Sequence, residues 1–285
     1  MRRTALDLAG EHPSRRPSYR VTVSVGLVVA LVNLPFLGAV LASFKTDAQI
    51  TSQPLSIPVP PTLVHYENAI YAAGYDFPQF FRNSTLIAVG TVILVLVIAT
   101  PASYAVVRLG LGGRWLLNGV AGLRLLPAIF FVIPMFVMFS RLGLLDTVYG
   151  MIVVDTFLNL PIAMVLLCSG IADIPSAFEE AAVVDGASPF RILTAIYVPL
   201  LGPTMVAASV VTFFFTWNDF LFAVILTTTR ARTVTVGATN FVTSFGIRWG
   251  DISAVTVLSA MVPILFAVFA RRYLVSGLTL GGVKG

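Results

Sequence analysis

The sequence EEAAVVDGASPF, residues 179–190, is a short polar interruption in a chain made mostly of long apolar runs. Ser176 stands three residues before Glu179, which is the spacing of a capping box. In that motif the serine oxygen accepts from a free backbone N–H, and the glutamate side chain reaches back. The helix that begins there is predicted to run to about Asp185. Gly186 then suits the left-handed backbone conformation that closes helices.

A second helix is predicted directly after this glycine. Ser188 can cap its first turn, and Pro189 fits the first helical position, where a missing N–H costs nothing. This helix would run toward Pro199. Residues 170–202 therefore form two short helices joined by a tight turn, set between two apolar runs. The local pattern alone leaves two interpretations open: a docking element for a partner, or a loop that only connects two spans.

The composition is that of a membrane protein. Of the 285 residues, 57% are hydrophobic and 11% are charged, which is too apolar for an ordinary soluble domain. A run of about 20 apolar residues can cross a bilayer as a helix. Such runs cover 21–42, 85–107, 116–139, 147–169, 203–226 and 253–270. Because they are apolar on every side rather than along one stripe, we predict an all-α integral membrane protein with six transmembrane helices.

The predicted layout is one membrane domain with two short flanking segments. Residues 1–20 form a polar N-terminal segment, 21–270 hold the six spans, and 271–285 form a C-terminal tail. Placing both termini inside puts most Lys and Arg residues in the cytoplasm, together with the 170–202 loop.

The first run follows a basic leader, as a signal peptide does. It exceeds the ~7–15 apolar residues of a signal core, so we predict an uncleaved first span.

Several functions are not predicted. The net charge of +5 comes without a basic stripe interleaved with aromatics, so no nucleic-acid partner is expected. The single Cys168 leaves no disulfide framework and no thiolate metal site. No catalytic residue and no metal ligand are assigned.

Polar side chains inside the predicted spans need a reason, because a charge at mid-bilayer costs about 2.5–3.5 kcal/mol on insertion scales. Asp155 and Asn159 are four residues apart and share one helix face. Trp217, Asn218 and Asp219 stand together in the fifth span. From the helical rise, the carboxylates and amides of both spans fall in the outer half of the bilayer.

These five residues form a candidate translocation path. Carboxylates and amides suit the hydroxyl groups of a polar solute, because they accept and donate in pairs, and Trp217 can stack on an apolar face of such a solute. The alternative is interhelical hydrogen bonding that holds the bundle together. Arg124 lies in the inner half of the third span, roughly 9 Å from Asp155 in depth by the helical rise. A direct pair would need a kink, which Pro127 could supply.

The helix pair also carries a family pattern. Glu180-Ala181-Ala182, three residues, Gly186, nine residues and then Ile196-Tyr197-Val198-Pro199 resemble the EAA loop of ABC-importer permeases, with Val198 where leucine is usual. Trp217-Asn218-Asp219 and the glycine-rich end at 277–285 are similar to the carbohydrate branch, of maltose type. The resemblance covers about residues 20–285.

The resemblance implies the type I ABC importer permease fold and a role in an ATP-driven sugar importer. Such permeases pair with a second homologous permease, sit on two ATPase subunits and receive solute from an extracytoplasmic sugar-binding protein. The EAA loop rests in a cleft of the ATPase, and the tail reaches toward the ATPase pair. The implied coupling residues are Glu179, Glu180, Ala181, Ala182, Asp185, Gly186 and Arg191, and the implied tail contacts are Gly281, Gly282 and Lys284.

ATP chemistry is expected on the partners. The sequence contains no G-x-x-x-x-G-K-[ST] phosphate loop, so we expect no cofactor in this chain and ATP and Mg on the ATPase subunits. The chain is then a transport subunit and not an enzyme. It is expected in the plasma (inner) membrane of a bacterium or archaeon, among membrane lipid. The pattern leaves the particular sugar open.

Two other functions are less consistent with the sequence. A stand-alone secondary transporter or channel predicts inverted repeats and helices broken at the midplane, and the sequence indicates neither. An intramembrane enzyme would need a motif such as H-E-x-x-H or G-x-S-x-G, and both are absent. His12 and His65 both lie outside the predicted spans.

Overall fold

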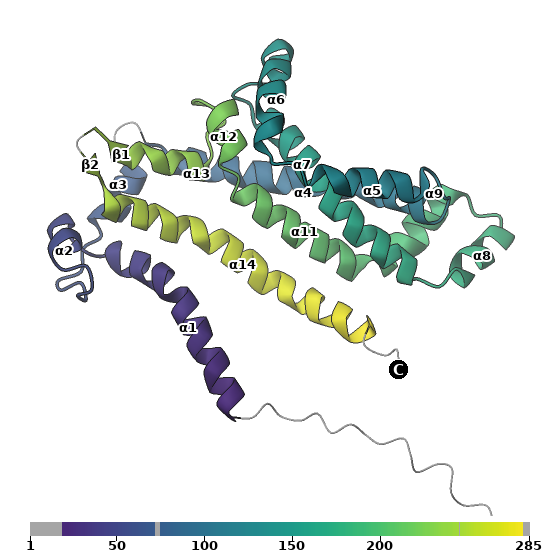
Figure 1. Ribbon diagram of the computed structural model, residues 1–285, viewed down its shortest axis with the longest axis horizontal. Helices are drawn as coiled ribbons and strands as arrows, with labels where there is room; N and C mark the ends of the chain where they lie inside the picture. Colours follow the sequence, from purple (N-terminus) through teal and green to yellow (C-terminus); the bar gives the residue numbers. More distant parts are fainter. Residues whose placement is uncertain (1–18, 72–74, 245, 282–285) are drawn as a thin grey trace, which may run out of the picture.

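The structure is a computed structural model that describes residues 19–71, 75–244 and 246–281. It is a bundle of long helices that run roughly along one axis (Figure 1). The elements are α1 (Tyr19–Ala42), α2 (Asp47–Ser52), α3 (Val64–Tyr71), α4 (Phe77–Val107), α5 (Gly113–Leu123), α6 (Ile129–Leu142), α7 (Val148–Asp173), α8 (Ala177–Val184), α9 (Pro189–Ile192), the π-helix η1 (Leu193–Tyr197), α10 (Val198–Leu200), α11 (Gly202–Trp217), α12 (Leu221–Leu226), α13 (Val234–Gly237), the 3₁₀-helix η2 (Ala238–Phe241), β1 (Val242–Thr243), β2 (Gly246–Ile247) and α14 (Trp249–Gly281).

Four helices of the described chain are long and apolar enough to cross a membrane: α1, α4, α7 and the Trp249–Arg271 part of α14. They correspond to the predicted runs 21–42, 85–107, 147–169 and 253–270. A bent pair, Pro189–Leu200 with Gly202–Trp217, is a further span by length and composition if it counts as one. The chain is therefore a multi-pass membrane protein built from helices.

The third predicted span is not one helix. The prediction of a continuous helix over 116–139 was wrong, because α5 ends at Leu123 and α6 begins only at Ile129. Pro127 has no N–H to donate and disfavours helical backbone at the residue before it. Other prolines, such as Pro161, lie inside continuous helices.

The fifth predicted span is interrupted as well. A continuous helix over 203–226 was predicted, but α11 ends at Trp217 and α12 begins at Leu221. Asn218 Nδ2 donates to the Phe214 carbonyl at 2.8 Å, and the Asp219 carboxylate accepts from the backbone N–H of Ala223 at 3.2 Å. Asparagine and aspartate side chains compete in this way with the helical ladder.

Helices α6 and α12 leave the direction of the long helices and lie next to one another (Figure 1). Val132 and Phe139 of α6 join Phe222 and Leu226 of α12 in one buried apolar cluster. The two short helices are packed into the protein despite the interruptions, because they bury their apolar faces against each other and against α7.

The main core lies between α4 and α7. A Cβ built on Gly90 of α4 would meet the Cδ1 atom of Ile152 in α7 at 2.5 Å, so the helices approach closely there. By contrast, α1 has no buried residue and is apolar on all sides. In a bilayer such a helix is covered by lipid or by another chain.

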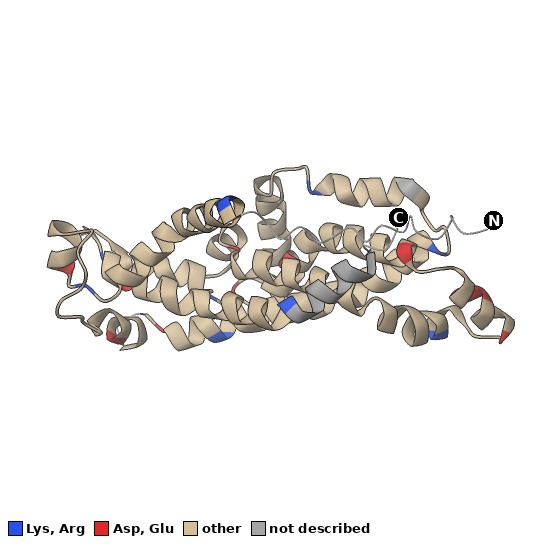
Figure 2. Cartoon of the chain, turned by 90° about the horizontal axis from the view of Figure 1, so that it is seen from below, with Lys and Arg blue, Asp and Glu red and all other residues tan. Residues whose placement is uncertain are grey.

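The connecting elements gather at two opposite ends of the bundle. The helices α2 and α3 and the β1–β2 ribbon lie at one end, and α8 and α9 lie at the other (Figure 1). Charged positions occur at both ends, with only scattered ones on the long helices between (Figure 2). Helix α14 continues past the predicted end of its span, so Gly281 is helical. Gly282 and Lys284 of the predicted tail lie outside the described residues.

Candidate functional site

The 170–202 loop contains the helix pair that the sequence predicts. Helix α8 ends with Asp185 as its C-cap, and Gly186 follows in the left-handed region at φ 76°. Ser188 accepts from the backbone N–H of Arg191, and Pro189 occupies the first turn of α9. The turn and the start of the second helix are therefore confirmed.

The predicted capping box was wrong. Ser176 already has helical backbone angles, φ −62° and ψ −23°, and its side chain makes no capping hydrogen bond. The Glu179 side chain does not reach back to the start of α8. It is occupied by groups on other helices, and these bonds across the fold replace the local one.

Glu179 faces the bundle. Its Oε1 atom accepts from the Tyr104 hydroxyl of α4 at 2.8 Å, and its Oε2 atom accepts from the Tyr197 hydroxyl of η1 at 2.8 Å. The Arg108 Nε atom lies 3.8 Å from Oε2. Only 18% of the Glu179 side chain is exposed, so this carboxylate is held inside the protein.

Arg108 ties this carboxylate to the end of α7. Its Nη2 atom donates to the carbonyls of Ile171, at 2.8 Å, and Ile174. Its guanidinium also lies over the Tyr197 ring, 5.4 Å from the centroid. Tyr104, Arg108, Glu179 and Tyr197 therefore form one cluster, which we call the α8 anchor.

The predicted coupling residues separate into two sets. Glu179 faces inward, and Ala182 packs against the buried cluster around Tyr197. The other members are exposed: Glu180, Ala181, Asp185, Gly186 and Arg191. Their roles toward an ATPase stay predictions.

The outward side of the helix pair is apolar as well as acidic. Val184 is 87% exposed and Phe190 is 75% exposed, and Phe178 and Val183 are exposed beside them. Glu180 lies on the same exposed helix. Large exposed apolar side chains gathered on one helix pair are typical of interaction sites. We call these five residues the α8 outer face.

The second helix of the pair continues into the bundle through an irregular segment. Helices α9, η1 and α10 follow one another without a gap, and η1 is a π-helix. Single turns of π-helix inside α-helices are frequent at functional sites. The segment Pro189–Leu200 then meets α11 at a bend of 77°.

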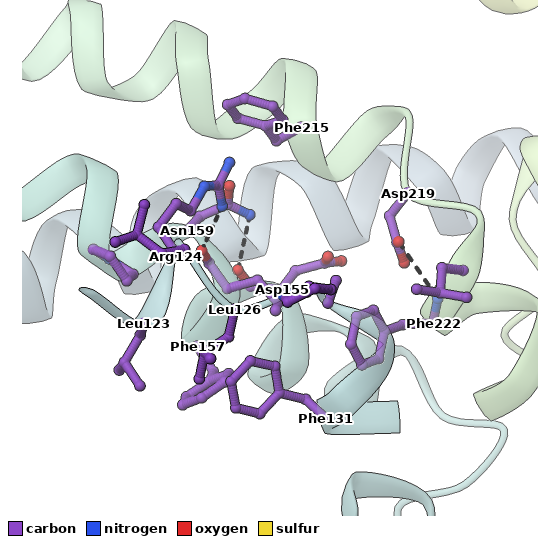
Figure 3. Close-up of a pocket in the computed structure, with 16 residues that line it drawn as sticks. Leu123, Arg124, Leu126, Phe131, Asp155, Phe157, Asn159, Phe215, Asp219 and Phe222 are labelled. Carbon is purple, nitrogen blue, oxygen red and sulfur yellow. Dashed lines mark hydrogen bonds between the residues drawn. The ribbon is translucent and has the colours of Figure 1, made fainter. Parts of the chain in front are cut away.

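A pocket of about 430 Å³ lies beside the interruption between α5 and α6. Its walls combine charged, amide and aromatic side chains: Arg124, Phe131, Asp155, Phe157, Asn159, Phe215, Asp219 and Phe222. Figure 3 shows Arg124 and Asn159 at one end of this space, with Asp155 between them and Asp219.

The two polar residues of α7 have spare hydrogen-bonding capacity in this pocket. Asp155 is 1% exposed, and its Oδ2 atom has no hydrogen-bond partner among the described residues. Asn159 Nδ2 donates to the Asp155 carbonyl at 2.8 Å and to Thr216 Oγ1 at 3.3 Å. The Asn159 Oδ1 atom finds no partner in the described chain. Two buried acceptors are therefore left for a ligand or a water molecule.

Arg124 is held by other groups than Asp155. Its Nη1 atom donates to the Leu158 carbonyl at 2.7 Å, and its guanidinium lies 4.5 Å from the Phe215 ring centroid. Within the described residues no ion pair joins Arg124 to Asp155. The prediction that a direct pair is difficult therefore agrees with the structure, although both residues line one pocket.

Trp217 and Asn218 line a different pocket, of about 550 Å³, with Asn33, Thr235 and Ser259. The Trp217 ring stacks on Phe213, with centroids 5.7 Å apart and planes 15° apart, so one indole face is already covered. The five candidate path residues are thus not gathered in one place: Asp155, Asn159 and Asp219 share one pocket, and the other two belong to the second.

Comparison with known proteins places this geometry in a family. The family model described as "Binding-protein-dependent transport system inner membrane component" matches residues 98–279. The trehalose/maltose transport system permease protein MalG of Thermococcus litoralis is 33% identical over 93% of this chain and 97% of its own length. The trehalose transport system permease protein SugB of Mycobacterium tuberculosis is 35% identical over 95% of this chain and 99% of its own length.

The fold agrees with that of a solved transporter. A chain from the crystal structure of "a bacterial ABC transporter involved in the import of the acidic polysaccharide alginate" superposes with a TM-score of 0.75 at 21% identity, over 89% of this chain and 95% of that one. The membrane-spanning helices and the exterior helix pair define a membrane permease. The chain belongs to the family of binding-protein-dependent transport system inner membrane components and is the permease subunit of an importer.

Interrupted helices do not separate an importer permease from a stand-alone secondary transporter. Helices broken at the midplane were expected for a stand-alone secondary transporter, and the structure interrupts the third and fifth runs. The family match identifies an importer permease.

Proposed function

We propose that this permease takes up sugars or related solutes in an ATP-driven assembly and receives the motion of ATPase subunits through α8. The α8 outer face carries the proposal. Phe178, Val183, Val184 and Phe190 are exposed on a helix pair at one end of the bundle, with Glu180 beside them. An apolar patch with an acidic residue suits a protein cleft that offers apolar walls and a basic group.

The proposed assembly contains a second homologous permease, two ATPase subunits and an extracytoplasmic sugar-binding protein. Helix α1, apolar and without a buried residue, provides surface for the second permease. ATP and Mg are bound by the ATPases. The names of the two relatives, which refer to trehalose and maltose, support a sugar as solute.

The proposed topology has six crossings, with both termini and the 170–202 loop in the cytoplasm. Helices α5 and α6 together make the third crossing, and α11 and α12 make the fifth. The tail with Gly281, Gly282 and Lys284 then lies on the ATPase side. The opposite end, with α2, α3 and the ribbon, faces the binding protein (Figure 1).

The proposed solute path includes the pocket of Asp155, Asn159 and Asp219. The unpartnered oxygens of Asp155 and Asn159 can accept from sugar hydroxyls, and the surrounding phenylalanines can contact the apolar face of a sugar ring. The second pocket brings Trp217 and Asn218 to a separate part of the path. Interhelical bonding remains the alternative role for all five.

Glu180→Arg and Val184→Asp test the coupling role, because each changes the α8 outer face without touching the bundle interior. We expect the ATPase to be lost from the purified assembly and ATP-driven uptake of maltose and trehalose to stop. The matched control is Asp173→Asn, an exposed acidic residue before the helix pair. Retained co-purification and uptake in both variants would contradict the proposal. Uptake without ATP would favour a stand-alone transporter.

A further inference from the structure

We infer that Glu179 is a positioning residue that fastens α8 to the membrane helices, and that it is not a contact to the ATPase. The inference rests on the proposed function, since it concerns how motion received by α8 enters the bundle. It reassigns one residue of the predicted coupling set. Glu180, the next residue, keeps the outward role.

The contacts of Glu179 use the whole carboxylate. Each oxygen accepts one tyrosine hydroxyl at 2.8 Å, from Tyr104 on one side and Tyr197 on the other. The Arg108 guanidinium supplies the nearest positive charge, with Nε 3.8 Å from Oε2. A partner ATPase would have to break these bonds before it could bind the same oxygens.

The donors are themselves fixed. Tyr197 is fully buried, Tyr104 is 4% exposed, and their rings lie 5.1 Å apart. Arg108 is held by the carbonyls of Ile171 and Ile174 at the end of α7. Glu179 therefore meets a preorganised set of donors, which makes the attachment of α8 more rigid than an exposed ion pair would.

The anchor joins the elements that a coupling movement must reach. Tyr104 and Arg108 stand at the end of α4, next to the end of α7. Tyr197 closes the π-helix η1, which leads through α10 to the bend before α11. Through one side chain, α8 is connected to α4, α7 and the segment that enters α11.

Three variants separate anchoring from docking. Glu179→Ala removes every bond that the Glu179 carboxylate makes and leaves α8 intact, because alanine has the highest helix propensity. The double variant Tyr104→Phe/Tyr197→Phe removes both hydroxyl donors but keeps both rings and the charge of Glu179. Glu180→Ala is the matched control, with the same change one residue later on the exposed side.

The first measurement is hydrogen exchange of the α8 backbone amides, 177–184, in the purified full chain without ATPase or nucleotide. Hydrogen bonds to a charged group stabilise by about 1.5–3 kcal/mol, which corresponds to roughly 10–100-fold faster exchange once they are lost. We expect this increase for Glu179→Ala and for the tyrosine pair, and no increase for Glu180→Ala.

The second measurement follows motion into the membrane with ATP and vanadate as the probe. In the wild-type assembly we expect nucleotide to change the exchange of both α8 and α11. Glu179→Ala should keep the ATPase bound and keep the change in α8, and lose the change in α11. Glu180→Ala should weaken ATPase co-purification instead.

The outcomes distinguish the two ideas. Loss of the ATPase in Glu179→Ala, or an unchanged α11 response there, would overturn the positioning role. A wild-type chain that never binds an ATPase would overturn the proposed function. In that case the nucleotide-free exchange experiment, done on the purified full chain, still decides whether Glu179 anchors α8.

Discussion

The Nδ1 atom of His65 lies 2.7 Å from the Oδ1 atom of Asp251, 186 positions later in the chain, and both side chains are buried. The other ring nitrogen, Nε2, lies 2.8 Å from the Lys45 carbonyl. A carbonyl and a carboxylate are both acceptors, so His65 can serve them only as a donor. This pair joins α3 to the first turn of α14, at the end of the bundle opposite α8.

His65→Phe should destabilise the protein by about 2 kcal/mol, because it removes a hydrogen-bond partner of the buried Asp251 carboxylate. A larger loss is not expected, since Arg248 Nε remains 2.5 Å from Asp251 Oδ2 and Asn68 still donates to Oδ1. Thermal unfolding in detergent measures it. Asp47→Asn is the control: Asp47 is exposed and 3.9 Å from His65 Nε2, and we expect less than about 1 kcal/mol. Equal unfolding temperatures for His65→Phe and wild type would refute the prediction.

Asp146 fixes the loop after α12. Its carboxylate accepts from the backbone N–H groups of Thr228, Thr229, Arg230 and Ala231. Burial works to raise the pKa of Asp146, but these backbone donors outweigh it and hold that pKa well below its usual range. The folded protein therefore favours the ionised form.

Asp146→Asn should cost about 2 kcal/mol at pH 7, because an amide nitrogen would face backbone donors. The folded pKa lies below the unfolded value of about 3.9, so the contribution is complete above about pH 5 and is lost as pH falls toward the folded pKa. Unfolding measured at pH 7 and pH 3 should show the gap between wild type and variant narrowing in acid. If the difference in stability between wild type and Asp146→Asn were the same at both pH values, the ionised carboxylate of Asp146 would not be its cause.

Substitutions at Gly186 test whether the cost of a side chain there comes from backbone strain or from contact with other atoms. A Cβ at this position would meet no atom within 4 Å, so any cost in this chain comes from the positive φ of 76°. Gly186→Asn should be tolerated, because asparagine adopts the left-handed conformation more readily, whereas Gly186→Val should cost about 1–2 kcal/mol. Chemical denaturation of both variants compares them. If asparagine is as harmful as valine, the left-handed turn is not the reason for glycine.

Asp155→Asn tests whether Asp155 contacts the transported solute or forms hydrogen bonds that hold the helices together. As part of the path, the carboxylate makes hydrogen bonds with solute that are worth about 1.5–3 kcal/mol, so uptake should fall about tenfold or more while the assembly purifies normally. Uptake of several mono- and disaccharides into proteoliposomes measures the effect. Asp173→Asn, exposed at the end of α7, serves as control. A variant that fails to assemble would assign Asp155 to the bundle instead.

Local chemistry was predictable from the sequence where it depends on neighbours in the chain. Gly186 ends α8 because of its own backbone freedom, and Ser188 with Pro189 starts α9 through contacts within one turn. The runs 21–42 and 147–169 form helices because apolar segments of that length have no other way to satisfy their backbone in a membrane.

Long-range contacts were not predictable in the same way. The partner Tyr104 is 75 positions from Glu179, so a capping box looked complete within the local sequence. A hydropathy profile does not detect a break in a helix such as Asn218–Phe220, because the residues on both sides of the break are apolar. One signal was available: Asp219 stands three residues before Phe222, and its carboxylate accepts from the backbone N–H of Phe222 as a helix-capping side chain does.

The bend of 77° between Pro189–Leu200 and Gly202–Trp217 has a mechanical consequence. Because the two helical segments meet near a right angle, a displacement of Pro189–Leu200 along its own axis would rotate α11 about the bend. A small stroke from a partner beneath the membrane would then tilt α11 across the bilayer plane rather than slide it through.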